Sequence, residues 1–419
     1  MYLQSVRTLS LVAALALAGC GVPSGQDGGS GGGAGGSGGS GGASGGAGGS
    51  GGSGGGGDAY AVPTVVTTKS LFWNDAAYLD DTTVISFAKL MAAASSDNHG
   101  GKLLERWFYR FGTTVHSERL LPAQFIDQLK LAQGSDPAQW NLALLPFKVT
   151  GIHNRIDLMK LGPGGHCGEF RASAASTDVT LQPFHALFIF QQPAGVGDTD
   201  ANGDVHCLAT ARAWADLSKL DGAELSTALK AAFARSLAAD RFVLAETVEF
   251  TLSPWEWRQW VKAADGTGAL PYVLENPPLF QQVDVEGLNL AGARRDGFLQ
   301  WVEANAASID ARTMAIPDVY RAQSVRVVQG VPRTPISLAG LNATVAAQYP
   351  QLRQKLELVG CAACHTADAD FVQTRPDRTV SPFYEKELLA RERHLEKIAG
   401  GLRPTAPFGP LQAAPVLPP

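Results

Sequence analysis

Residues 28–57 are almost entirely glycine, serine and alanine, and this run limits what the rest of the chain can fold into. A stretch with almost no apolar side chain cannot bury enough surface to offset the entropy lost when its backbone is ordered. We therefore interpret residues 20–57 as a flexible tether with a root-mean-square span of about 30 Å. Any folded core must come from residues 58–419, and this length is sufficient for one large unit and a smaller tail.

The N-terminus has the features of an export signal. Arg7 precedes an apolar run at residues 9–17, which is shorter than the roughly 20 residues that a membrane-spanning helix needs. The sequence Leu17–Cys20 resembles the bacterial lipobox, which implies removal of residues 1–19 and acylation of Cys20. By the same resemblance, the residue after the acylated cysteine is Gly21 and not the aspartate that is typical of retention in the inner membrane, so we expect the protein in the outer membrane. We expect a lipid-anchored protein of the cell envelope, and the alternative is an ordinary signal peptide followed by a chance cysteine.

A C-x-x-C-H motif near the C-terminus is formed by Cys361, Cys364 and His365. This spacing attaches a c-type haem, because the two thiols bond to the porphyrin and the histidine lies under the iron. The motif therefore predicts one covalent haem, with His365 as its proximal ligand and electron transfer as its role. A Cys361–Cys364 disulfide, a metal site or free thiols are the alternatives. If the cysteines form such a pair and no haem is attached, the protein would be a non-catalytic envelope protein for binding or assembly.

The sequence leaves the second axial ligand of this haem open. No methionine follows His365, so the tail cannot supply Met/His ligation. His394 lies at the edge of an apolar helix face and is a distal candidate. The large domain could instead supply Met159, Met314 or a histidine, or the sixth position could be open to a small molecule. The redox partner protein stays unidentified.

Two of the five cysteines are left after Cys20 and the C-x-x-C-H motif are assigned. An even remainder in an exported protein suggests a Cys167–Cys207 disulfide, and two buried free thiols are the alternative. Because His166 and His206 precede these cysteines, the bridge would bring the two imidazoles close enough to hold a metal.

The body mixes helical and strand patterns without regular alternation, which predicts an α+β fold. Strands are expected at residues 143–158, 169–177, 185–193 and 242–252. Helices are expected at residues 80–96, 209–220, 222–239, 294–309, 344–360 and 381–401, and residues 100–134 are expected to form two helices with an irregular join. We divide the chain into a large α+β domain at residues 58–350 and a small, helical, cytochrome c-like segment at residues 351–419.

Two charged motifs, Asn154–Leu158 (NRIDL) and Cys167–Arg171 (CGEFR), lie ahead of the C-x-x-C-H. The combination resembles an uncharacterised group of bacterial lipoproteins. That resemblance implies a shared fold and a genuine haem motif. It gives no information about a substrate. On paired strands, the charges of the two motifs could form crossed ion pairs. Such a cluster is either a buried network that fixes strand register or the polar floor of a ligand pocket.

An acidic loop, Asp198–Asp204, carries Asp198, Asp200 and Asn202 at alternate positions and Gly203 at the sixth, as a calcium loop does. Ala209 stands where the closing carboxylate would be, so calcium is one interpretation and a solvated loop is the other. The net charge of −5, without a Lys/Arg cluster, argues against nucleic acid as a partner.

Overall fold

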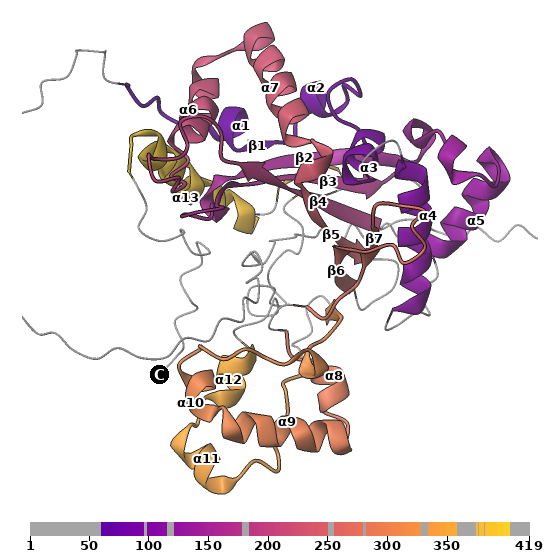
Figure 1. The fold of residues 1–419 in the computed structure, drawn as a ribbon, viewed down its shortest axis with the longest axis vertical. Helices are drawn as coiled ribbons and strands as arrows, with labels where there is room; N and C mark the ends of the chain where they lie inside the picture. Colours follow the sequence, from indigo (N-terminus) through magenta and orange to yellow (C-terminus); the bar gives the residue numbers. More distant parts are fainter. Residues whose placement is uncertain are drawn as a thin grey trace, which may run out of the picture.

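The α+β prediction is confirmed by a computed structural model (Figure 1). The residues that this structure describes are 60–95, 99–114, 121–177, 184–249, 255–279, 282–327, 334–357, 374–375, 377–380 and 382–402. Within them, one antiparallel sheet forms the centre and helices pack around it.

The sheet has eight strands in the described part of the chain, in the order β1-β2-β3-β4-β5-β6-β7, with β8 paired to β6. Neighbouring strands from β2 to β7 follow one another along the chain, and α6 and α7 interrupt this sequence between β4 and β5. The strands are β1 (Phe72–Trp73), β2 (Phe147–Arg155), β3 (His166–Ser176), β4 (Phe184–Pro193), β5 (Phe242–Glu249), β6 (Trp255–Ala263), β7 (Val273–Glu275) and β8 (Ser324–Val327).

The helices flank and follow this sheet, and none that the structure describes is long and apolar enough to cross a membrane. The α-helices are α1 (Thr67–Ser70), α2 (Ala76–Leu79), α3 (Phe87–Ser95), α4 (Gly100–Arg110), α5 (Leu121–Gln133), α6 (Leu208–Asp216), α7 (Gly222–Ser236), α8 (Val285–Leu288), α9 (Ala293–Ala304), α10 (Ala306–Asp310), α11 (Ala343–Gln348), α12 (Leu352–Glu357) and α13 (Pro382–Ala399). The 3₁₀ turns are η1 (Phe111–Thr113), η2 (Pro137–Gln139), η3 (Leu142–Leu144), η4 (Ile156–Leu158), η5 (Leu217–Lys219), η6 (Ala239–Arg241) and η7 (Asp318–Tyr320).

One face of the sheet is apolar and is covered by helices. Helix α4 presents Leu104, Trp107 and Phe108 at helical spacing, and all three are fully buried. Trp107 packs edge-on against Phe188 of β4 and Trp260 of β6. The main hydrophobic core therefore lies between this face and the helices α3 to α7.

A second, smaller core lies among the helices α8 to α12, seen in orange below the sheet in Figure 1. It extends from Val283 to Leu356, so the expected domain boundary at residue 350 falls inside it. Helix α13 instead contributes Leu395 and Ile398 to the main core. The chain thus leaves the sheet after β7, returns as β8, leaves again, and reaches the sheet once more at residue 374.

Candidate functional site

The second face of the sheet is polar, and we call it the polar face. Strand register aligns its side chains: Gly151 lies opposite Ser173, which lies opposite Leu187, followed by Glu246 and Gln259. Because side chains alternate along a strand, the residues two positions away share this face. Its polar members include His153, Arg155, Glu169, Arg171, Ser173, His185, Glu246 and Gln259, and of these all except Glu169 are buried.

Each of the two charged motifs closes its own ion pair. Arg155 donates from Nε and Nη2 to both carboxylate oxygens of Asp157, at 2.9–3.2 Å. Arg171 binds Glu169 through Nε at 2.7 Å and Nη2 at 2.5 Å. We expected ion pairs that cross between the two motifs, but each pair forms within its own motif, because Asp157 lies beyond the strand in the turn η4. Arg155 and Glu169 nevertheless face each other in the strand register.

A third cation reaches this cluster from the last helix. Arg391 of α13 lies 3.8 Å from Asp157, measured from Nε to Oδ1, and both side chains are about 2% exposed or less. Burial alone would raise the pKa of Asp157, but the charges of Arg155 and Arg391 outweigh it and hold the pKa well below its usual range. Asp157 therefore links the end of β2, at one edge of the polar face, to the helix α13.

Among the buried groups of the polar face, Arg171 and Glu246 have atoms without a hydrogen-bond partner within the described residues. These atoms are Nη1 of Arg171 and both carboxylate oxygens of Glu246, a residue that is 0% exposed. Burial raises the pKa of Glu246 to about 7, and the positive charge of Arg171 opposes this shift without cancelling it. Buried polar atoms of this kind are uncommon in folded proteins and often mark functional sites.

The raised pKa of Glu246 predicts a pH-dependent stability. The folded state holds this proton more tightly than the unfolded chain, in which the ordinary value is 4.5, so the contribution of Glu246 to stability should fall as the pH rises from about 5 to about 7. Buried histidines with lowered pKa values contribute in the opposite direction, so the effect is the difference between wild type and Glu246→Gln. Glu246→Gln should remove this contribution and stabilise the protein by about 3 kcal/mol at pH 8. Chemical denaturation across this pH range measures the effect, with Glu224→Gln on the exposed surface as the control. An unchanged slope in Glu246→Gln would contradict the assignment.

Two buried histidines lie on the same face. Nε2 of His153 is 3.3 Å from the hydroxyl of Ser173, and Nε2 of His185 is 3.5 Å from the hydroxyl of Thr150. Burial is the main cause that lowers both histidine pKa values, to about 3 for His185. Both imidazoles are therefore neutral at physiological pH, the form in which histidine binds metals.

The segment that follows the C-x-x-C-H returns to the sheet next to these histidines. Thr374 donates from Oγ1 to the hydroxyl of Ser173 at 3.2 Å. A Cβ on Gly151 would lie only 2.6 Å from Oγ1 of Thr374, so a glycine is needed for this close approach. Arg378 secures the same turn by donating to the carbonyl of Val149 from Nε and Nη2, at 3.3 and 3.2 Å.

Several predicted site residues lie outside the residues that the structure describes: Cys20, Cys361, Cys364 and His365. His394 is described. It is half-buried on α13, one helical turn from Arg391, and burial lowers its pKa while the charge of Asp157 opposes that effect. Its role as a distal ligand stays a prediction.

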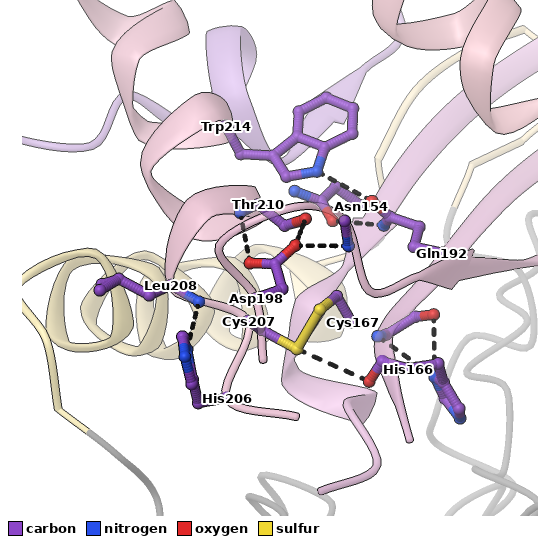
Figure 2. Close-up of a disulfide and its surroundings, with 12 residues drawn as sticks. Asn154, His166, Cys167, Gln192, Asp198, His206, Cys207, Leu208, Thr210 and Trp214 are labelled. Carbon is purple, nitrogen blue, oxygen red and sulfur yellow. Dashed lines mark hydrogen bonds between the residues drawn. A yellow bond between two sulfur atoms is a disulfide. The ribbon is translucent and has the colours of Figure 1, made fainter. Parts of the chain in front are cut away.

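Cys167 and Cys207 form a disulfide, with their Cα atoms 5.3 Å apart (Figure 2). The bridge joins the beginning of β3 to the residue before α6. It does not create the expected histidine pair, because Figure 2 shows His166 and His206 on opposite sides of the disulfide. Each of these imidazoles instead accepts a hydrogen bond at Nδ1 from a nearby backbone N–H, at 3.3 Å.

The carboxylate of Asp198 organises the acidic loop beside this disulfide. It accepts hydrogen bonds from the backbone N–H and hydroxyl of Thr210, at 2.8 and 2.6 Å, and from the N–H of Gly195 at 2.9 Å (Figure 2). Asp200 accepts from the N–H groups of Asn202 and Asp204, at 2.8 and 3.1 Å. Among the described residues, no group of three or more His, Cys, Asp or Glu side chains is arranged to hold a metal. The loop conformation is explained by these hydrogen bonds, and calcium stays a prediction.

Sequence reasoning did not single out Glu246 or Thr374 as site residues. A glutamate in the middle of an apolar strand, "FVLAETVE", was the available signal for Glu246, whereas nothing local marks Thr374. No family model, curated protein or solved structure matches this chain.

Proposed function

We propose that this protein is a lipid-anchored cell-envelope protein that carries one covalently bound c-type haem and transfers electrons. Cys361 and Cys364 would bind the porphyrin and His365 would ligate the iron. The observation that carries the proposal is the C-x-x-C-H spacing in a chain with a lipoprotein-type export signal. The Cys167–Cys207 disulfide is consistent with an oxidising compartment outside the cytoplasm.

The described residues around the motif have the chemistry that such a group requires. Thr374 follows His365 by nine positions and is fixed on the polar face beside two neutral, buried imidazoles. Nine residues span at most about 30 Å, so the haem would lie within that distance of Thr374. The haem iron would supply one-electron chemistry by cycling between its ferric and ferrous states. The protein would supply attachment, axial nitrogen ligands and exclusion of water.

A second candidate function is a non-catalytic envelope protein for binding or assembly, with a Cys361–Cys364 disulfide. The unpartnered atoms of Arg171 and Glu246 favour this alternative, since a bound polar ligand could satisfy them. The two candidates differ in whether haem is covalently attached.

Expression in a bacterium with active haem maturation tests the proposal. A denaturing gel stained for haem peroxidase activity should show one band at the size of the protein, because only covalent haem survives denaturation. Cys361→Ser/Cys364→Ser should abolish the stain, whereas Cys20→Ala should keep it, since Cys20 is assigned to the lipid. An unstained wild-type band would refute the haem and leave the binding function.

A further inference from the structure

We propose that a polar pocket at the edge of the sheet binds a small zwitterion of the α-amino acid class. This function goes beyond the proposed electron transfer and does not depend on a haem. The pocket has a volume of about 180 Å³ and lies where α4 packs beside β7 (Figure 1). Its lining includes Arg110, Thr113, Thr114, Trp260, Glu275 and Asn276. Since a cavity of about 150 Å³ holds a benzene ring, this pocket has room for about six to nine non-hydrogen atoms.

A gap between two edge strands forms one wall of the pocket. Strand β7 pairs with β6 at residues 261–263 and β8 pairs with the same edge of β6 at residues 255–258, so neither covers the middle of β6. Asn276 closes this gap by donating from Nδ2 to the carbonyls of Gln259 and Gln323, each at 2.9 Å. Its Oδ1 is buried and has no hydrogen-bond partner among the described residues. The wall therefore contains an acceptor whose hydrogen bond a donor in the pocket would complete.

Two opposite charges lie in the lining of the pocket. Nη2 of Arg110 lies 3.3 Å from Oε1 of Glu275, and the two side chains are 45% and 48% exposed. An ion pair with this exposure is weak, and the guanidinium has five N–H donors, of which this contact uses one. A ligand carboxylate can therefore bind the guanidinium, while a ligand ammonium binds the carboxylate of Glu275.

The two threonine hydroxyls of the pocket are available to a ligand as acceptors. Thr113 donates from Oγ1 to the carbonyl of Arg110 at 2.9 Å, and Thr114 donates from Oγ1 to the carbonyl of Phe111 at 2.8 Å. Because a hydroxyl has one hydrogen, these bonds leave only oxygen lone pairs for a ligand. The pocket thus combines several acceptors, which suit the three N–H groups of an ammonium, with one cation for a carboxylate.

Ligands of other classes fit this lining less well. Glu275 would repel a simple anion, and Arg110 would repel a simple cation. A metal ion lacks ligands here, since the described residues contain no group of three or more His, Cys, Asp or Glu side chains that could hold one. An apolar molecule would leave the polar lining without hydrogen bonds. A zwitterion satisfies both charges at once.

Isothermal titration calorimetry of the purified full-length protein in detergent tests the assignment, with L-alanine and L-serine as probes. Ethylamine and propionate each keep one charged group of L-alanine and lack the other, so each should bind at least about tenfold more weakly than L-alanine. Arg110→Gln and Glu275→Gln should each weaken the binding of L-alanine by about tenfold or more. Lys230→Gln is the matched control, because Lys230 is 48% exposed and pairs with Asp81 instead, and it should leave the affinity unchanged.

The three variants change side chains that are about half exposed, so they should keep the denaturation midpoint of the wild type, and a loss of binding would then report on the pocket. No heat of binding from either amino acid at millimolar concentration would overturn the assignment. Equal affinities for L-alanine and ethylamine would also overturn it, as would an unchanged affinity in both Arg110→Gln and Glu275→Gln. The haem stain plays no part in these measurements, so failure of the proposed function is detected separately.

Discussion

Asp157→Asn should lower the free energy of unfolding by about 3–5 kcal/mol, because it removes one partner of a buried ion pair. The carboxylate is 2% exposed and is shared by Arg155, which binds it through two nitrogens, and by Arg391 of α13. Asparagine keeps the volume of the side chain but leaves two buried guanidinium groups without this counter-charge. The loss should appear in chemical denaturation at pH 7.

Asp221→Asn is the matched control, because Asp221 pairs with Lys69 at the surface with 86% of its side chain exposed. An exposed pair of this kind contributes at most about 1 kcal/mol. The depressed pKa of Asp157 adds a second signature: its contribution is present above the ordinary carboxyl pKa and is lost as the pH falls through the lower folded value. The difference between wild type and Asp157→Asn should therefore narrow in strong acid. Equal stability of the two proteins at pH 7 would show that the cluster is not structural.

Cys167→Ser/Cys207→Ser should destabilise the protein by about 4 kcal/mol. The two cysteines are separated by 40 positions, so the bridge removes a large amount of loop entropy from the unfolded chain. Both sulfur-bearing side chains are 0% exposed, which means that the serine hydroxyls would also be buried. The midpoint of denaturation of the double variant, compared with the oxidised wild type, measures this effect.

Mass mapping provides the control for this second result. Proteolysis of the thiol-blocked, oxidised wild type should release Cys167 and Cys207 in one cross-linked peptide. Reduction of the wild type should lower its stability to about that of the double variant. Alkylation of both cysteines without prior reduction would contradict the bridge, and the stability loss would then need another cause.

The sequence predicted much of the sheet, because apolar and polar residues alternate along its central strands. The stretch 169–177 overlaps β3 up to Ser176, the stretch 185–193 lies in β4, and residues 242–252 begin with β5. Strand β6 was not predicted. It carries Glu256 and Arg258, and both are buried in a mutual ion pair rather than facing water. Charged side chains usually lie at the surface, so a buried strand that contains them lacks the ordinary pattern of a strand.

The two charged motifs were predicted to share a cluster because the charges of each motif would lie on one face of its strand if the two strands paired. The partners that complete the cluster come from elsewhere. Arg391 reaches Asp157 from a helix more than 200 positions away, and Glu246 is placed two strands from Ser173, on the same face of the sheet, by the register of three strands. A single sequence does not specify which strands become neighbours, so these partners could not be predicted.

Helix α13 has a consequence for how the chain is made. It is the final helix of the described chain, yet it supplies Leu395 and Ile398 to the main core and Arg391 to the sheet. In a chain delivered from its N-terminus, residues 361–365 precede this helix, so the main core is still incomplete when the two motif thiols appear. In the exported protein that we propose, those thiols would therefore be available for modification before folding is complete.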